Sequence, residues 1–183
     1  MTSLAGQLLI AMPQMQDPRF VRSVIFMCAH NPDGAMGLVI NKIVEQPSIE
    51  DVLSQLGLAG AGFHGTPVHF GGPVESGRGF VLHSADYTEA GTLVVGTRIG
   101  LTATIDILRA IGSGGGPRRR LLALGYSGWG PGQLDAEIQA NGWLHVAADD
   151  DLVFDEGFED KWRRAIAKLG VDPSALSGDA GHA

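Results

Sequence analysis

The apolar residues of this chain occur in short runs, and the longest unbroken run is the six residues from Val24 to Ala29. A helix that crosses a bilayer needs roughly 18 or more apolar residues in succession, so we expect no membrane-spanning helix. Glycine separates many of these runs and contributes 27 of the 183 residues, about twice the usual share of roughly 7%. Short apolar runs between glycine-rich turns are typical of short β-strands.

The charged residues and the single cysteine restrict the classes of function. The chain carries 13 basic and 20 acidic side chains, a formal net charge of -7. A negative protein surface repels nucleic-acid phosphates, so we expect no direct binding to DNA. One cysteine excludes an internal disulfide framework and a cysteine-based zinc site. The six histidines show no i,i+4 pair, and we therefore expect neither a metal nor another cofactor.

The N-terminal residues give an expectation for location. They contain no basic segment, and their apolar stretch from Leu8 to Met12 is five residues long. A secretory signal peptide has a basic start and a longer apolar stretch. We therefore expect a cytoplasmic protein.

The order of the predicted elements indicates an α+β fold in a single domain over residues 1–183. Strands are expected at Leu8–Ala11, Ser23–Ala29, Gly37–Asn41, Val68–Phe70, Gly79–His83, Thr92–Val95, Leu121–Tyr126 and Trp143–Ala147. The turn Asn31-Pro-Asp-Gly34 predicts a hairpin between the second and third of them. Helices are expected after the N-cap Ser48, at Thr104–Ile111, from Pro131 through Ile138, and at Glu159–Leu169. Hairpin-linked strands with scattered helices favour α+β over an alternating α/β fold.

Three local patterns resemble catalytic motifs, and each has a simpler interpretation. Gly60–Gly65 matches the dinucleotide-binding glycine pattern, but it follows a predicted helix instead of a strand. The loop predicted at Ser127–Pro131 lacks the second outer glycine of a nucleophile elbow, because Trp129 stands there. Cys28 and His30 share one face of a strand, as a nucleophile and its base would. Since Cys28 lies in the longest apolar run, we expect a buried, slowly reacting thiol.

Two charged segments have ordinary surface interpretations. Arg118-Arg119-Arg120 is the only basic run, and three charges are few for a nucleic-acid footprint. Seven acidic residues and no basic residue lie from Asp149 to Asp160. In the last helix, Glu159–Arg163 and Asp160–Arg164 have the spacing of i,i+4 ion pairs. We interpret these segments as surface arginines and a solvated acidic face.

Motifs along nearly the whole chain resemble the AlgH/YqgE family of small bacterial proteins. They are Gln16-Asp-Pro-Arg-Phe-Val-Arg-Ser-Val24, Cys28-Ala-His-Asn31, Gly34-Ala-Met-Gly37, Asn41-Lys42, Gly71-Gly-Pro-Val74, Arg78-Gly-Phe80 with His83, Gly125-Tyr126 with Trp129, Gly132-Gln-Leu134 and Ala180-Gly-His-Ala183. The resemblance implies an α+β fold whose bifurcated, mostly antiparallel sheet forms a pseudo-barrel with flanking helices. It also brings a family label of transcriptional regulator, while the family's biochemical function is unassigned and no catalytic residue can be transferred.

The glycine-dense segments 34–37, 71–73 and 125–132 form the candidate site. Each begins or ends a predicted strand, where glycine permits close backbone approach or positive φ. We expect the three segments to lie together and to border one concavity; the alternative is that each glycine serves only its own turn. The candidate ligand-binding residues in and beside the segments are His30, Asn31, His69, Gly71, Gly72, Trp129 and Gln133.

Three functions are compatible with these observations. The first is a non-enzymatic regulatory protein that binds a partner protein or a small molecule, which fits the lack of a recognisable catalytic constellation. The second is a transcriptional regulator that binds DNA directly, against which the net charge of -7 argues. The third is an enzyme that uses Cys28 with His30, or the Ser127 loop.

Overall fold

The computed structural model describes residues 3–58, 60–63, 65–155 and 157–171. The strands in these ranges are β1 (Gln7–Ala11), β2 (Val24–Asn31), β3 (Gly34–Val39), β4 (Ile43–Val44), β5 (Val68–Phe70), β6 (Val74–Ser84), β7 (Leu93–Val95), β8 (Ile99–Thr102), β9 (Arg120–Trp129) and β10 (Trp143–Ala147). The α-helices are α1 (Ile49–Gln55), α2 (Ile105–Gly112), α3 (Gln133–Gln139), α4 (Asp150–Phe154) and α5 (Lys161–Ala167), with 3-10 turns η1 (Ala61–Phe63) and η2 (Phe158–Asp160). The C-terminal motif Ala180–Ala183 lies outside the described residues.

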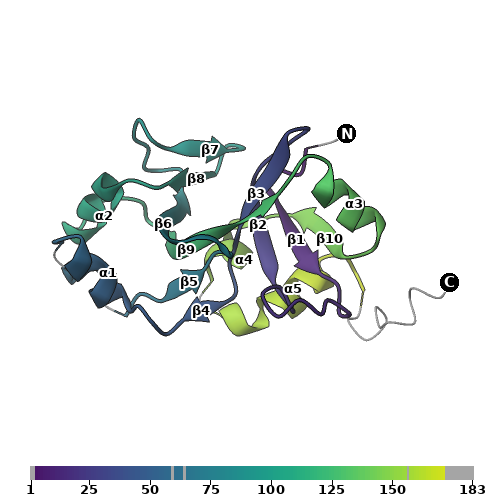
Figure 1. Cartoon of the computed structure of the whole chain (residues 1–183). Helices are drawn as coiled ribbons and strands as arrows, with labels where there is room; N and C mark the ends of the chain where they lie inside the picture. Colours follow the sequence, from purple (N-terminus) through teal and green to yellow (C-terminus); the bar gives the residue numbers. More distant parts are fainter. Residues whose placement is uncertain (1–2, 59, 64, 156, 172–183) are drawn as a thin grey trace.

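The strands form one curled, mostly antiparallel sheet in the order β10-β1-β2-β3-β9-β6-β8-β7 (Figure 1). The long strand β9 is the branch point of this sheet. Its first half pairs with β6 and, in parallel, with β5, whereas its second half pairs with β3. This arrangement confirms the expected α+β fold with a bifurcated sheet and flanking helices. The two ends of β9 therefore have different neighbours: β5 and β6 at the start, and β3 at the end.

Local sequence explains several of these elements. The predicted reversal at Asn31-Pro-Asp-Gly34 does join β2 to β3, and the side chain of Asn31 accepts a hydrogen bond from the Asp33 N–H within it. Ser48 begins α1 with a capping box, because its hydroxyl accepts from the Asp51 N–H while the Asp51 carboxylate accepts from the Ser48 N–H. The turn and the helix cap each form between residues three positions apart, so both could be predicted from the sequence.

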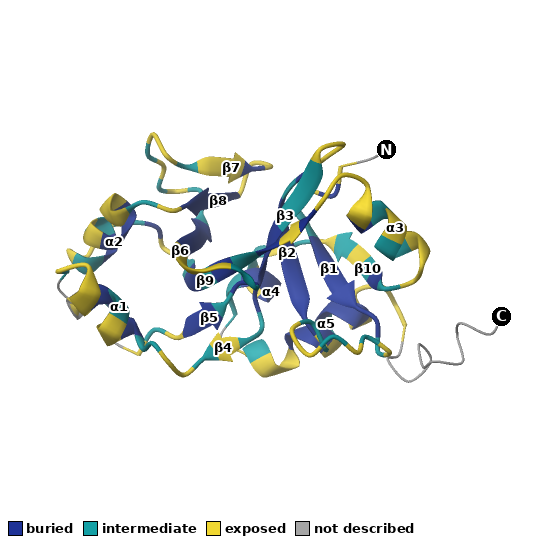
Figure 2. Ribbon diagram, in the orientation of Figure 1, coloured by how far each residue is buried: buried dark blue, intermediate teal, exposed yellow. Residues whose placement is uncertain are grey.

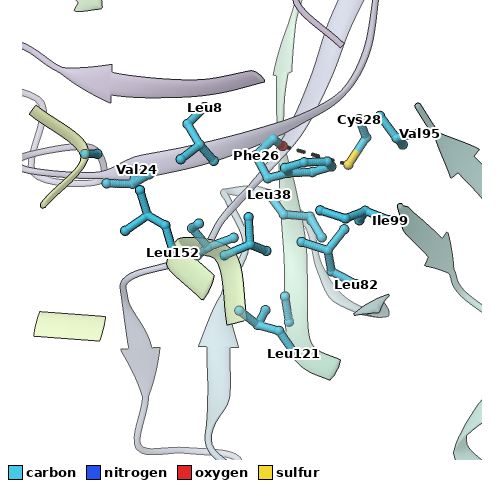
Figure 3. Packing of buried hydrophobic residues seen from close by; sticks show 14 of the residues in the cluster. Leu8, Val24, Phe26, Cys28, Leu38, Leu82, Val95, Ile99, Leu121 and Leu152 are labelled. Carbon is cyan, nitrogen blue, oxygen red and sulfur yellow. Dashed lines mark hydrogen bonds between the residues drawn. The ribbon is translucent and has the colours of Figure 1, made fainter. Parts of the chain in front are cut away.

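The core is divided among three apolar clusters, and the strands carry most of it (Figure 2). The largest cluster packs Phe26, Leu38 and Leu82 from the sheet against Leu152 of α4 and against α5 (Figure 3). A second cluster lies under α3, and a third lies between α1, α2 and the first half of β9. None of the helices in the described ranges is long and apolar enough to cross a membrane.

The structure differs from prediction around the end of β9. Ser127–Pro131 was expected as a loop, but Ser127, Gly128 and Trp129 continue the strand because they pair with Ala35–Gly37 of β3. The following helix begins after Gly132, which has φ +72°, so Pro131 lies outside it. A pairing with a strand about 90 residues away leaves no local sequence signal.

The C-terminal helix also differs from prediction. The expected helix at 159–169 is split into η2 and the shorter α5. Arg164 bonds to Asp155 at 3.2 Å instead of to Asp160. The acidic segment contains an unpredicted helix, α4, which begins at Asp149 because the Asp149 carboxylate accepts from the Leu152 N–H.

Candidate functional site

The three glycine-dense segments meet at the second half of β9. Gly71 lies at the centre: its carbonyl oxygen accepts from the Val39 N–H at 2.9 Å and from the Ser127 hydroxyl at 3.1 Å. Its own N–H donates to the Leu124 carbonyl at 2.9 Å. The segment 34–37 pairs with residues 127–129 of the same strand. The prediction that the three segments lie close together is therefore confirmed.

Two of these glycines are required by backbone packing. A Cβ on Gly71 would stand 2.2 Å from the Gly125 carbonyl oxygen, and a Cβ on Gly72 would stand 2.1 Å from the Tyr126 carbonyl carbon. Both distances are far below van der Waals contact, which lies at about 3.5–4.0 Å between carbon atoms. These glycines thus hold one segment against another, and do more than shape their own turn.

Two adjoining hollows lie at the end of β9, one beside the β2–β3 hairpin and β6 and one beside α3. We call the two together the β9 groove. It consists of an open hollow of about 690 Å³ on the hairpin side and a second hollow of about 460 Å³ on the α3 side. The two hollows share Val74, Gly128 and Trp129 in their lining. The hairpin side adds Asn31, Met36, Arg78, Phe80 and Tyr126, and the α3 side adds Arg19, Phe20, Gln133, Glu137 and Trp143.

The hairpin side of the groove has an aromatic wall with a cation above it. The guanidinium of Arg78 lies 5.0 Å from the centre of the Phe80 ring, and Phe80 meets Tyr126 edge to face at 5.9 Å. Arg78 is half exposed and also approaches Glu75 at 3.7 Å. An aromatic surface with a solvent-accessible cation can hold both apolar and acidic groups of a ligand.

The α3 side of the groove is fixed by one carboxylate. Oε1 of Glu137 accepts from the indole N–H of Trp129 at 3.1 Å and from that of Trp143 at 2.9 Å. Oε2 of Glu137 accepts from the Gln133 side-chain amide at 2.8 Å. Because the two indole rings also meet edge to face at 6.1 Å, this wall is a preorganised surface.

The predicted site residues separate into three groups. Asn31, Trp129 and Gln133 line the β9 groove. Gly71 and Gly72 lie behind it, against the backbone of β9. The remaining two, His30 and His69, do not line it: His69 lines a different cavity, described below.

His30 is a buried structural residue. Its Nδ1 accepts from the Leu4 N–H at 3.0 Å, and its Nε2 lies 3.5 Å from the Asp135 carboxylate. The ring therefore ties the N-terminal segment and α3 to the end of β2. Neither nitrogen is directed at Cys28 by a hydrogen bond.

Sequence reasoning missed several residues that line the groove. Met36, Arg78, Phe80 and Tyr126 belong to motifs that carry the family resemblance, but none was chosen as a site residue. Phe80 and Tyr126 come from strands that the sequence does not show to be adjacent, and Val74 pairs with Tyr126 across a bulge. Only the paired sheet brings their side chains to one surface.

The two candidate nucleophiles are buried. Ser127 donates its hydroxyl to the Gly71 carbonyl. The Cys28 side chain lies against the Phe26 carbonyl, with 3.8 Å between sulfur and oxygen (Figure 3). Burial raises the pKa of the Cys28 thiol to about 12. Both groups thus contribute to packing in the described structure.

We expect Cys28 to react slowly with thiol reagents in the native protein. A buried thiol with a raised pKa holds almost no thiolate at pH 8. Labelling with an aromatic disulfide should be slower, at least about tenfold, than in urea, where the same thiol is exposed. Equal rates in the two states would contradict the buried position.

The sequence was compared with protein families and with known proteins. A family model described as AlgH-like matches residues 8–174. The chain belongs to the AlgH-like family. A UPF0301 protein of Rhodospirillum rubrum is 54% identical, over 98% of this chain and 94% of its own length. A UPF0301 protein of Cereibacter sphaeroides is 55% identical, over 98% and 99% of the two chains.

Solved structures agree with this AlgH-like assignment. The solution structure of the AlgH protein from Pseudomonas aeruginosa is 42% identical, covers 100% of this AlgH-like chain and 97% of its own, and superposes with a TM-score of 0.82. A protein of Corynebacterium diphtheriae, 20% identical with a TM-score of 0.77, shares the fold. The names of these proteins state no activity, and among the described residues no group of three or more potential ligands is placed to hold a metal ion.

Proposed function

We propose that this AlgH-like chain is a non-enzymatic cytoplasmic regulatory protein that binds a segment of a partner protein in the β9 groove. The observation that carries this proposal is the pair of adjoining hollows whose linings share Val74, Gly128 and Trp129. Because the two hollows meet at these residues, one extended ligand can reach from the hairpin side to the α3 side.

The lining of the groove favours a protein ligand. Tyrosine, methionine and arginine are among the residues enriched in protein interfaces, and the groove presents the partly exposed Tyr126, Met36 and Arg78. Trp129 and Phe80 lie buried beneath them.

Each side of the groove carries one arginine with acidic residues: Arg78 with Asp33 on the hairpin side, and Arg19 with Asp17 and Glu137 on the α3 side. Such a surface suits a segment with an apolar centre and polar groups at both ends.

Regulation through a protein partner is preferred over direct binding to DNA. Binding to a duplex requires several lysine or arginine contacts to phosphates. The groove carries two arginines, Arg19 and Arg78, and each is within 4 Å of a carboxylate. With acidic Asp33 and Glu137 also in the lining, phosphate contacts here would be weak.

The proposal is tested by a substitution that fills part of the groove. Gly128 is exposed, and a Cβ there would stand 3.4 Å from the Tyr126 ring, so Gly128→Gln is compatible with the fold and obstructs the hairpin side where the two hollows meet. The protein is purified under native conditions from cells of the source organism. We expect the amount of partner protein that co-purifies with this variant to fall about tenfold or more, as loss of one hot spot would cause.

The matched control is Gly115→Gln. Gly115 lies in an exposed loop after α2, where a Cβ would meet the Ala110 oxygen at 3.4 Å. This variant should retain the partner at the level of the unchanged protein, measured by quantitative mass spectrometry. Equal retention by both variants, with folds verified by circular dichroism, would contradict a partner site in the β9 groove.

A further inference from the structure

A second cavity, of about 350 Å³, lies at the opposite end of β9. We call it the arginine cavity. Its lining comes from β5, which runs parallel to β9 here, from residues 118–122 at the start of β9, and from the connection between α4 and α5. Arg118, Arg119, Arg120 and His69 line it together with the aromatic rings of Phe154 and Phe158. The tertiary structure thus places the one basic run of the sequence beside a concave surface.

Two of the three arginines have no ion pair in the part of the chain that the structure describes. Arg119 is paired with Asp151 at 2.9 Å, and Asp155, the acidic residue of the lining, is paired with Arg164 at 3.2 Å. Arg118 and Arg120 appear in no such pair among the described residues. Asp86, outside the lining, accepts from the Arg118 N–H at 3.0 Å and offsets part of the Arg118 charge. With three arginines and one acidic residue, the lining still has an excess of positive charge, although the whole chain carries a net charge of -7.

Arg120 is held in place by neutral groups. Its guanidinium donates to the Gly62 carbonyl at 3.0 Å and to the Pro117 carbonyl at 3.3 Å. These bonds fix the side chain but leave its charge uncompensated. A guanidinium has five N–H donors, so further donors of Arg120 remain for a ligand.

His69 lines the same cavity and contains a buried polar atom. The residue is 5% exposed, and its Nδ1 is buried with no hydrogen-bond partner among the described residues. Burial and the nearby Lys161 ammonium lower the pKa of His69 to about 4, against the opposing effect of a backbone hydrogen bond at Leu122, so the ring is neutral at pH 7 and adds no positive charge to the cavity. A buried polar atom without a partner is uncommon in native structures and calls for an explanation such as a missing ligand.

We propose that the arginine cavity binds a phosphate dianion, either free or as the monoester of a small molecule, through Arg118 and Arg120, beside the neutral ring of His69. The planar donors of arginine match the oxygens of phosphate, and bonds from a guanidinium to an anionic oxygen are among the stronger hydrogen bonds in proteins. A volume of about 350 Å³ is in the range of small-molecule sites, roughly 300–1,000 Å³. Phe154 and Phe158 would contact the organic part of a monoester.

The experiment is a titration followed by NMR of the amide and imidazole groups. Inorganic phosphate and phenyl phosphate are added separately at constant ionic strength, with sodium chloride as the reference. We expect saturable shifts at His69 and Leu122 for phosphate. If phenyl phosphate binds more tightly, the site takes a monoester; equal affinity indicates free phosphate.

Arg118→Gln provides the variant, because Arg118 is exposed and its side chain has no hydrogen bond to a described residue. Its affinity for phosphate should fall about tenfold, as expected for one charge-assisted hydrogen bond. Arg109→Gln removes the same charge from exposed α2, outside the cavity, and should leave the affinity unchanged. The proposal is overturned if neither anion gives saturable shifts at His69, if both variants weaken binding equally, or if a DNA duplex displaces phosphate from His69.

Discussion

Gly72→Ala should unfold the protein or destabilise it by more than about 4 kcal/mol, which is the range reserved for severe core defects. The added Cβ would lie within 2.4 Å of three backbone atoms of Tyr126 and Ser127. Backbone atoms of a central strand cannot move aside without breaking the pairing of β9 with β3 and β6. Urea denaturation followed by circular dichroism measures the change in the free energy of unfolding.

Gly57→Ala is the control for this prediction. Gly57 also has positive φ, at +69°, but a Cβ there would meet no atom within 4 Å. The cost should therefore be the conformational one alone, about 1–2 kcal/mol. If Gly72→Ala were no more destabilising than Gly57→Ala, the close approach of segment 71–73 to β9 would be wrong.

The stability of the protein should rise with pH because of Lys161. Lys161 has no exposed surface, and its ammonium donates to the Val153 carbonyl at 2.6 Å and to the Ile40 carbonyl at 3.3 Å. Burial lowers the pKa of Lys161 from 10.5 to about 8, against the opposing effect of Asp155. Between these two values the unfolded chain retains the proton that the folded chain has released. Raising the pH from about 7 to about 9.5 should therefore add about 2 kcal/mol to the free energy of unfolding from Lys161. The raised pKa of Cys28 partly offsets this gain, because the unfolded thiol ionises first.

Lys161→Met isolates this effect. Methionine preserves the length and removes the titrating group, so between pH 7 and 9.5 the free energy of unfolding of the variant should rise by about 2 kcal/mol less than that of the unchanged chain. Other groups that titrate in this range are common to both proteins and cancel in the comparison. Lys168→Met, at an exposed lysine paired with Asp149, should keep the rise. An identical pH profile for Lys161→Met and the unchanged chain would contradict the buried ammonium.

Elements with a local cause could be predicted from the sequence. The β2–β3 turn and the Ser48 capping box depend on residues three apart, and both are present. Strands that form only by pairing with a distant strand were not predicted, or were predicted too short. β8 pairs with β6 and contains Gly100, which weakens its strand signal, and the end of β9 is a strand only because β3 lies beside it.

The same distinction applies to the candidate site. Glycine density correctly indicated that segments 34–37, 71–73 and 125–132 approach one another, because only glycine permits such contact. It could not separate the residues that line the groove from those behind it, since that depends on the face each strand presents. His69 was predicted as a site residue because it precedes Gly71 in the sequence. In the structure it lines the cavity at the other end of β9.

Site-specific photo-crosslinking in growing cells tests most directly whether the β9 groove binds a partner protein. A photo-reactive phenylalanine derivative replaces Arg78, which is half exposed on the rim of the groove, or Arg109 on α2 as the control. We predict one discrete protein adduct from position 78, none of that mass from position 109, and loss of the adduct when Gly128→Gln is added. The same adducts from both positions, or an adduct at position 78 that persists with Gly128→Gln, would contradict the account.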